Sequence, residues 1–256
     1  MFETLCTSKS GLNANQIKLD VIGNNIANSS TMGYKRVDVG FQDLLNESLN
    51  RQGYPTVDKN ATMGTGVKTS DMFRDNGQGN LTQTDLKTDL AIEGQGYFKI
   101  NQPDGSEVYT RDGSFKIDKL GILVDGRGNK VDIKYAAGRS EANCKLDESN
   151  LLVDKDGSIY MKENGVVNKV AEIPVYSALG DTSFTSIGEN LFVPTAGSNV
   201  QRTTNVVLHQ GLIEGSNVDI TTEFTDMIVT QRAFQLCAKG VTTADEMWGM
   251  VNNMRR

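Results

Sequence analysis

Apolar residues recur at every seventh position near both ends of the chain. The C-terminal row consists of Ile220, Met227, Phe234, Val241 and Trp248, and a second row three residues later consists of Cys237, Ala244 and Val251. A seven-residue repeat is typical of helices that pack against other helices along a narrow seam. We therefore predict a helix over about residues 219–254, which would be roughly 50 Å long at about 1.5 Å per residue.

Polar and small residues are expected to shape this C-terminal helix. Ser216 or Asn217 is expected to cap its first turn, because short polar side chains accept hydrogen bonds from the free amides there. Gly240 and Gly249 each weaken a helix by about 1 kcal/mol relative to alanine. We therefore expect these glycines to allow close approach of another backbone or to mark a bend.

A second helix is predicted at the N-terminus, where Leu5, Leu12, Leu19 and Ile26 form a narrow apolar row. It should end within residues 28–33, because asparagine, serine and glycine favour caps and left-handed turns. Two interpretations fit the terminal rows. Either the rows are seams that neighbouring subunits complete, or the two helices form an ordinary amphipathic pair packed on the middle domain.

The residues expected to form the turn after the N-terminal helix are Asn24, Asn25, Asn28 and Gly33. The asparagines are expected to bond to backbone groups at the helix end or across subunits, and simple capping is an equal alternative.

The middle of the chain has the pattern of strands and turns. Residues 109–117 and 151–160 each place an Asp-Gly turn between short alternating segments, which predicts hairpins. Further turns are expected at Asp104-Gly105, Asp125-Gly126 and Asn164-Gly165. This spacing predicts a mostly antiparallel β domain.

Residues 34–75 have neither pattern and are interpreted as a connector. Phe41, Leu44, Leu45 and Leu49 are expected to form a short helix, followed by a loop over residues 53–66. The predicted fold class is α+β, with long terminal helices that pair as a coiled-coil-like inner domain and a mostly antiparallel β middle domain. The predicted segments are an N-terminal helix at 1–33, the connector at 34–75, an outer β domain at 76–212 and a C-terminal helix at 213–256.

Composition excludes several classes of protein. The chain has 256 residues, with 26 basic and 32 acidic side chains and a net charge of −6. An acidic chain of this kind argues against nucleic-acid binding, which needs a basic face. Neither a membrane-spanning run nor a cleavable signal peptide is expected from the sequence. Cys6, Cys144 and Cys237 are too scattered for a zinc site or a disulfide framework, and their spacing leaves open whether Cys6 and Cys237 approach each other.

Candidate catalytic and binding motifs are weak. Three Gly-x-Gly sequences, at residues 64–66, 77–79 and 94–96, complete no phosphate-binding pattern. Asp154-Lys155-Asp156-Gly157 resembles the start of a calcium loop, but its twelfth position is glycine, so a hairpin turn is expected.

Titratable side chains give no catalytic pattern either. Asp85, Asp89 and Glu93 are expected to be solvated charges, and the single histidine, His209, is expected to pack at a boundary. We therefore predict no enzyme activity, no cofactor, no metal site and no small-molecule substrate.

Four sequence blocks resemble bacterial flagellar rod and hook proteins. Residues 19–36, LDVIGNNIANSSTMGYKR, match the N-terminal signature of that family. Three further blocks agree in the same order, at residues 89–98 (DLAIEGQGYF), 109–115 (YTRDGSF) and 214–218 (EGSNV), with the helix continuing through residues 231–234 (QRAF). The resemblance covers nearly the whole chain, and residues 130–205 are its least diagnostic part.

The resemblance implies terminal helices that form a coiled-coil inner domain and subunits that assemble into a hollow helical shaft. It also implies a place in the flagellar basal body, in a rod that crosses the periplasm or cell wall, and export through the flagellar channel without a cleaved signal peptide. The implied partners are further copies of the chain, other rod proteins, the hook protein, the export apparatus and the rings around the rod.

A distal rod subunit is favoured within this family. The similarity is seen at residues 79–84, 229–234 and 242–247, whereas residues 212–218 are also similar to a proximal rod protein. The short 36–75 connector departs from some distal rod proteins, which carry an insertion there. Alternatives are a proximal rod subunit, a short hook-type axial protein, a basal-body enzyme acting on peptidoglycan, and a soluble assembly cap or chaperone.

Overall fold

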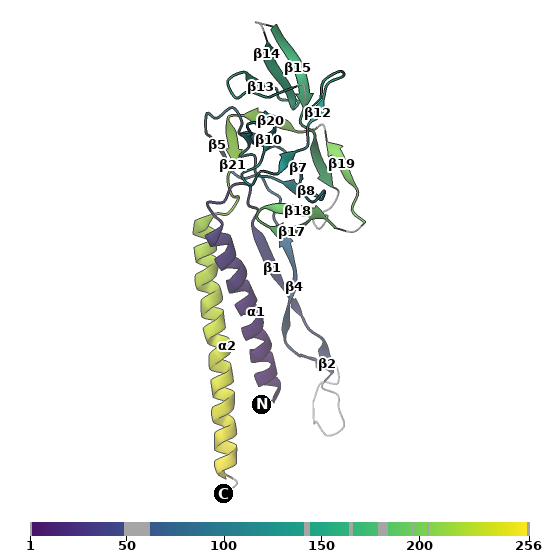
Figure 1. The fold of residues 1–256 in the computed structure, drawn as a ribbon. Helices are drawn as coiled ribbons and strands as arrows, with labels where there is room; N and C mark the ends of the chain where they lie inside the picture. The colour runs from purple at the N-terminus through teal and green to yellow at the C-terminus, as the bar shows by residue number, and fades with distance from the viewer. Residues whose placement is uncertain are drawn as a thin grey trace. The chain divides into compact units, whose positions relative to one another are not determined.

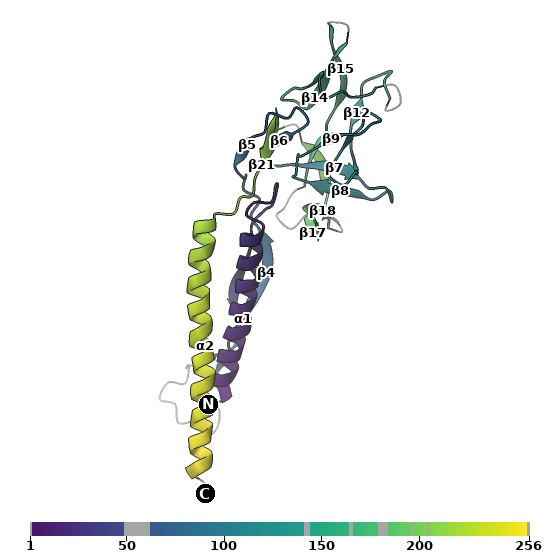
Figure 2. The same cartoon turned by 60° about the vertical axis from the view of Figure 1, so that its left-hand side comes forward.

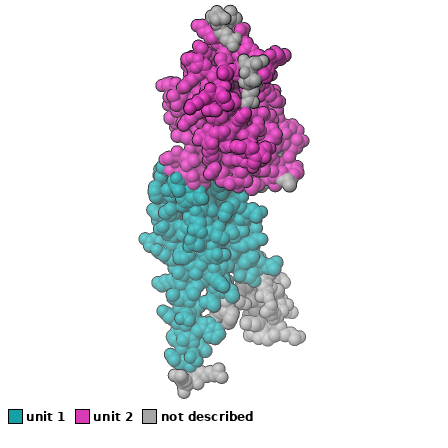
Figure 3. Space-filling view, in the orientation of Figure 1, with its two compact units in different colours: residues 1–27, 37–73, 219–256 teal, residues 28–36, 74–218 magenta. Residues whose placement is uncertain are grey.

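The described residues form two compact units (Figure 3). The structure is a computed structural model that describes residues 2–48, 62–140, 144–163, 166–178, 184–195, 197–203 and 205–254. The helical unit takes its described residues from 1–27, 37–73 and 219–256, and the β unit takes its described residues from 28–36 and 74–218. The α+β class predicted from the sequence is confirmed, with helices from both ends of the chain packed together.

The helical unit contains helices α1 (Phe2–Ala27) and α2 (Ile220–Met254), which lie side by side and run in opposite directions (Figures 1 and 2). α1 ends directly before Asn28, as the polar sequence there predicts. In the described part of the chain, neither helix combines the length and apolar content that a bilayer-spanning helix requires. A coiled-coil supercoil of the pair stays a prediction.

The predicted cap of α2 is wrong by two to three residues, because the helix is capped by Asp219. Its carboxylate accepts hydrogen bonds from the Thr221 amide at 3.0 Å and the Thr222 hydroxyl at 2.7 Å. The Thr222 hydroxyl and then the Thr221 amide lower the pKa of Asp219. Asn217 is unavailable as a cap, because its amide bonds to backbone groups of the β unit.

A two-stranded ribbon lies beside α1 in the helical unit (Figure 1). It consists of β1 (Val37–Asp43) paired with β4 (Val67–Arg74), and β2 (Asn46–Ser48) paired with β3 (Thr62–Gly64). The predicted short helix in this region is therefore wrong, although Leu49 lies outside the described residues. Val37, Val39 and Phe41 alternate along β1, and this period of two decides the local structure.

The β unit is built from antiparallel strand pairs. Its largest sheet contains, in spatial order, β17 (Phe184–Gly188), β18 (Leu191–Pro194), β8 (Glu107–Thr110), β7 (Tyr97–Asn101), β11 (Lys130–Val131), β10 (Leu123–Val124) and β9 (Lys116–Ile117). β16 (Val175–Ala178) pairs with β7 and with β19 (Val200–Thr203).

Smaller sheets complete the β unit. One has the order β12 (Lys134–Tyr135), β15 (Val166–Glu172), β14 (Ser158–Glu163) and β13 (Leu151–Val153). Two further pairs are β20 (Val207–Gln210) with β6 (Leu90–Glu93) and β21 (Leu212–Glu214) with β5 (Leu81–Gln83).

The predicted hairpins have different outcomes. The turn at residues 154–157 joins β13 to β14, and Gly157 there has a φ of 78°, so this hairpin is confirmed. The hairpin predicted at residues 109–117 is wrong, because β8 pairs with β7 and β18 whereas β9 pairs with β10. The reason is that Gly113 packs against β6, where its carbonyl accepts a hydrogen bond from the Leu90 amide at 3.0 Å. Asn164-Gly165 lies outside the described residues.

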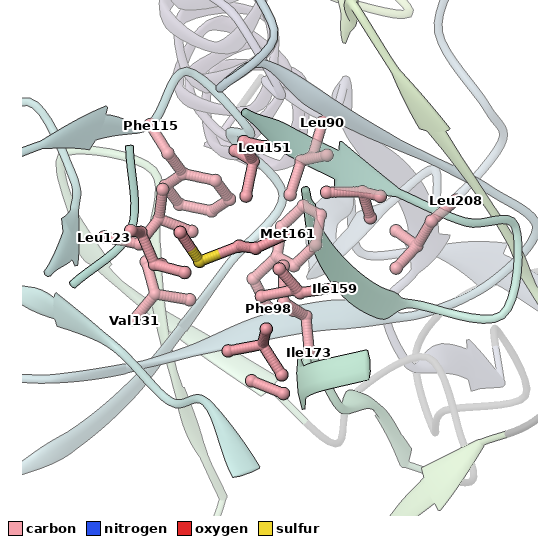
Figure 4. Close-up of a cluster of buried hydrophobic side chains, with 14 of the residues drawn as sticks. Leu90, Phe98, Phe115, Leu123, Val131, Leu151, Ile159, Met161, Ile173 and Leu208 are labelled. Atoms are coloured by element: carbon pink, nitrogen blue, oxygen red, sulfur yellow. The ribbon is translucent and has the colours of Figure 1, made fainter. Parts of the chain in front are cut away.

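The main core of the β unit consists of apolar side chains from the large sheet and the β12–β15 sheet (Figure 4). Phe98 on β7 is fully buried, and its ring meets that of Phe115 edge to face, with 5.0 Å between the ring centroids. Leu123, Ile159 and Met161 are buried in the same cluster. The core packs against the large sheet, in which strand β8 leads directly into Arg111.

Phe98→Ala is expected to lower the free energy of unfolding of the β unit by about 3–5 kcal/mol, because it removes buried area and leaves a cavity. Leu152→Ala on β13 is the control, since that side chain is 55% exposed, and a change within about 0.5 kcal/mol is expected there. Denaturant unfolding of the full chain measures both values. Equal losses in the two variants would contradict the assignment of this core.

Candidate functional site

Small and polar residues take part in the contact between α1 and α2. A Cβ atom on Gly11 would lie 3.0 Å from the sulfur of Cys237, and one on Gly240 would lie 2.7 Å from the hydroxyl oxygen of Ser8. Gly11 of α1 thus lies beside Cys237 of α2, and Ser8 of α1 lies beside Gly240 of α2. Because the residue numbers fall along α1 while they rise along α2, the two helices are antiparallel. The close approach expected at Gly240 is confirmed, whereas Gly249 has open space around it.

The inward row of α2 carries polar groups. Its buried residues are Glu223, Thr230 and Ala244, at multiples of seven residues from one another. The Glu223 carboxylate accepts a hydrogen bond from Asn25 of α1 at 3.2 Å, and the Thr230 hydroxyl donates to the Asp226 carbonyl at 2.7 Å. Burial of a polar side chain destabilises a fold little when the side chain is hydrogen-bonded. Glu223 and Thr230 both have such bonds, so this row can pack against α1.

The predicted seam residues flank this contact. The half-buried ones are Leu5, Leu12, Leu19, Ile26, Met227, Phe234 and Val241. Ile220 and Trp248 are exposed. A role of these residues as a seam between subunits stays a prediction.

The residues predicted to form the turn after α1 occupy different environments. The Asn25 side chain donates to the Val37 carbonyl at 2.8 Å and accepts from the Val37 amide at 3.1 Å, which ties α1 to β1. Asn24 is exposed. The Asn28 side chain accepts from the Thr31 hydroxyl at 3.1 Å, and Gly33 adopts a φ of 67°.

The β unit buries a carboxylate between two cations. Glu214, at the end of β21, is almost fully buried, as are Lys35 and Arg111. One carboxylate oxygen of Glu214 accepts from Lys35 Nζ at 2.6 Å and from the Gly79 amide at 2.8 Å. The other oxygen accepts from Arg111 Nε at 2.5 Å. We call Lys35, Arg111 and Glu214 the charged cluster.

The cations of the charged cluster are also held by backbone carbonyls. Arg111 donates to the carbonyls of Ile92 at 3.0 Å, Gly94 at 2.6 Å and Gly96. Lys35 donates to the Gly77 carbonyl at 2.8 Å. These bonds matter because a buried ion pair is tolerated only when its remaining polar atoms are satisfied.

Burial and charge act in opposite directions on Glu214. Burial alone would raise its pKa, but the positive charge of Arg111 and the hydrogen bond from Lys35 outweigh burial and hold the pKa below its usual value. Burial lowers the pKa of Lys35, the hydrogen bond that Lys35 donates to Glu214 opposes this, and the charge of Arg111 lowers the pKa further. The folded β unit therefore stabilises the ionised form of Glu214.

The main chain around the charged cluster is equally constrained. The Gly33 amide donates to the Glu214 carbonyl at 2.8 Å. A Cβ atom on Gly33 would lie 2.7 Å from the Asp112 nitrogen, so only glycine fits there. The side chain of Asn217 accepts from the Arg36 amide at 2.6 Å and donates to the Asp75 carbonyl at 3.0 Å. The four sequence blocks quoted above thus all contribute to this one site.

The remaining candidate groups form no second site. His209 Nε2 lies 2.7 Å from a Glu93 carboxylate oxygen on the paired strands β20 and β6. Asp89 is buried and accepts from the Thr84 hydroxyl at 2.6 Å, so the expectation that it is solvated is wrong. Over the described ranges, no three acidic, histidine or cysteine side chains are grouped to hold a metal ion, and the cysteines are free thiols.

Protein-family models match most of the regions described above. Residues 5–35 match "Flagella basal body rod protein", residues 91–168 match "Flagellar hook protein FlgE/F/G D1 domain" and residues 209–254 match "Flagellar basal body rod FlgEFG protein C-terminal".

Individual relatives cover the whole chain. The flagellar basal-body rod protein FlgG of Borreliella burgdorferi is 35% identical, over 100% of both chains. The chain belongs to the flagellar basal-body rod protein family. FlgG of Buchnera aphidicola from Acyrthosiphon pisum is also 35% identical, over 96% of this chain and 97% of that protein. The hook-basal body complex protein FlhP of Bacillus subtilis is 29% identical over the full length of both.

Membership of the rod family identifies a structural component of the flagellar basal body and not an enzyme. It supports assembly with other rod and hook components. The charged cluster of this rod-family chain was missed by sequence reasoning. The only signal was at Glu214, which stands between Ile213 and Gly215, because Lys35 and Arg111 each have a charged neighbour and so resemble surface residues.

Glu214→Gln is expected to lower the free energy of unfolding at neutral pH by about 3–5 kcal/mol, because it leaves Lys35 and Arg111 without a countercharge. The lowered pKa of Glu214 means that its contribution is present above its ordinary value of 4.5 and is lost as pH falls through the folded-state pKa. In the Glu214→Gln variant, the free energy of unfolding should therefore fall less than in the wild type as the pH is lowered through this range. Denaturant unfolding of the full chain at a series of pH values measures both effects.

Glu189→Gln is the control for the Glu214 variant, because the Glu189 side chain is 68% exposed and its pairing with Arg127 is worth at most about 1 kcal/mol. Acid sensitivity that is the same in the two variants would show that Glu214 is not the group responsible.

Gly33→Ala is expected to destabilise the β unit more than Gly105→Ala does. Both glycines have positive φ, so both variants carry a backbone penalty of about 1–2 kcal/mol. A Cβ on Gly105 meets nothing within 4 Å, whereas one on Gly33 meets the backbone of Asp112. The difference in melting temperature between the variants reports this steric cost, and equal melting temperatures would contradict the close approach.

Proposed function

We propose that the chain is a distal rod subunit that polymerises into a hollow helical shaft and transmits torque from the motor to the hook. Names of the relatives and the family models support the rod assignment. The resemblance of residues 79–84, 229–234 and 242–247 supports the distal position. Export through the flagellar channel and contact with the surrounding rings are part of the same proposal.

The observation that carries the proposal is a stripe of exposed apolar residues along α2. Successive residues of a helix are rotated by about 100°, so residues separated by 3, 4, 7 or 11 positions share a face. The stripe, which we call the outer stripe, consists of Val229 (62% exposed), Leu236 (71%), Met247 (47%), Met250 (59%) and Met254 (86%). Its members are exposed, whereas Glu223, Thr230 and Ala244 pack inward, and Gly240, which contacts α1, lies at the edge of the same stripe.

Exposed apolar side chains gathered along a helix in this way mark a surface that binds another protein. The partner proposed here is the helical unit of a further copy. Each apolar contact contributes only about 25 cal/mol per Å² of buried area, so one interface is modest. Repetition along a polymer adds many such interfaces, and a shaft that must resist twisting needs this repetition.

Leu236→Glu is expected to weaken polymerisation strongly without unfolding the subunit. Leu236 is exposed in the single chain, so the free energy of unfolding should change by no more than about 0.5 kcal/mol. Loss of a buried leucine costs about 1.5–3 kcal/mol at the interface, which raises the concentration needed for polymerisation at least about tenfold. Sedimentation and electron microscopy of the purified chain measure polymerisation, and motility of a strain lacking its own subunit measures function.

Gln235→Glu is the matched control, because it adds the same charge one residue away on an exposed position that contacts Arg232 of the same helix. This control should polymerise and support motility. Normal polymerisation of Leu236→Glu, or motility after deletion of the last 36 residues, would refute the proposed assembly role of α2.

A further inference from the structure

A small positively charged pocket lies beside the charged cluster in the β unit. It has a cavity volume of about 70 Å³, and its polar lining includes Lys35, Arg74, Asn76, Gln95, Arg111 and Ser177. Several water molecules or one small oxyanion fit in such a volume, whereas a nucleotide does not. The pocket is separate from the outer stripe, which belongs to the helical unit.

Arg74 is the cation of this pocket that keeps its donors available. Its guanidinium lies over the ring of Phe192, 4.8 Å from the ring centroid. Stacking uses the face of a guanidinium and leaves its N–H groups at the edge. Across the described ranges of the chain, no carboxylate lies at ion-pair distance from Arg74. Burial lowers the pKa of Arg74, and the hydroxyls of Tyr97 and Tyr34 oppose this effect.

The charges around the pocket do not cancel. Lys35, Arg74 and Arg111 carry three positive charges, and the buried carboxylate of Glu214 offsets one of them. The negative charge of Asp75, an exposed residue, raises the pKa of Lys35. The Asp75 carboxylate also accepts a hydrogen bond from the Gly77 amide. A net positive charge therefore remains even when Asp75 is included.

The shape and polarity of the lining favour a planar anion. Tyr97 and Phe184 supply an apolar wall, with 4.7 Å between their ring centroids. Arg111 and Lys35 are already engaged by Glu214, so Arg74 supplies the donor pair. The edge of a guanidinium binds a carboxylate through two parallel hydrogen bonds, and these bonds are stronger away from bulk water.

We propose that this pocket binds a carboxylate side chain supplied by a second copy of the chain. The chain as a whole is acidic, with 32 acidic against 26 basic residues, so a neighbouring copy presents carboxylates to a positive pocket. This proposal rests on the proposed polymerisation for its partner. The chemistry of the pocket itself does not depend on polymerisation.

The test combines a free carboxylate with variants of Arg74. Sodium malonate, at constant ionic strength, is titrated into the full-length monomer while the unfolding temperature is measured. Malonate should stabilise the wild-type chain, and Arg74→Gln should weaken its apparent affinity at least tenfold. Arg74→Lys keeps the charge and the aliphatic stem over Phe192 but lacks the paired donors, so its affinity for malonate should be intermediate. An intermediate value would show that the weaker binding of Arg74→Gln is not caused by misfolding.

Arg127→Gln is the matched control, because Arg127 is exposed and pairs with Glu189 away from this pocket. Its response to malonate should equal that of the wild type. Equal stabilisation of all four proteins would overturn the pocket, since malonate would then act on the chain without a specific site.

A polymerisation assay shows whether the carboxylate comes from a second copy of the chain or from a free ligand. Malonate should raise the concentration at which the wild-type chain polymerises, and Arg74→Gln should need a higher concentration than wild type without malonate. Binding of malonate that depends on Arg74 but leaves polymerisation unchanged would overturn the second copy as the source and indicate a free carboxylate ligand. A wild-type chain that binds malonate but never polymerises would count against the proposed function and leave the pocket established.

Discussion

The burial of one carboxylate organises the β unit. Glu214 stands at the end of β21 and loses its hydration, so it requires positive partners and backbone donors within hydrogen-bonding distance. Those partners come from segments that are far apart in the sequence, namely Lys35 after α1, Gly79 before β5 and Arg111 after β8. The need to satisfy this single group therefore fixes where three remote parts of the chain meet.

The helical unit follows a different principle. Its inward contact uses Gly11, Gly240 and the Asn25–Glu223 hydrogen bond, whereas large apolar residues of α2 face outward. Small residues allow two helices to approach closely, and a hydrogen-bonded polar pair fixes their register. The exposed apolar side chains of α2 are thus available for other contacts, which is consistent with a chain that belongs to a rod-forming family.

The sequence predicted the elements that have a strong local pattern. Both terminal helices and the hairpin at residues 154–157 follow from heptad spacing and from an Asp-Gly turn. The inward row of α2 was not predictable from hydrophobicity, because Glu223 and Thr230 are polar and are satisfied only by tertiary or helix-backbone bonds. The hairpin at residues 109–117 failed for a related reason, since Arg111 and Gly113 are held by β6 and by Glu214 in preference to a local turn.

The antiparallel register of the helix pair leaves the C-terminal end of α2 beyond the first residue of α1 (Figure 2). That overhang carries Met247, Met250 and Met254. Methionine has three rotatable bonds and a polarizable sulfur, so it adapts to surfaces of different shape. An adaptable tip of this kind can follow small differences in shape between the surfaces that it meets.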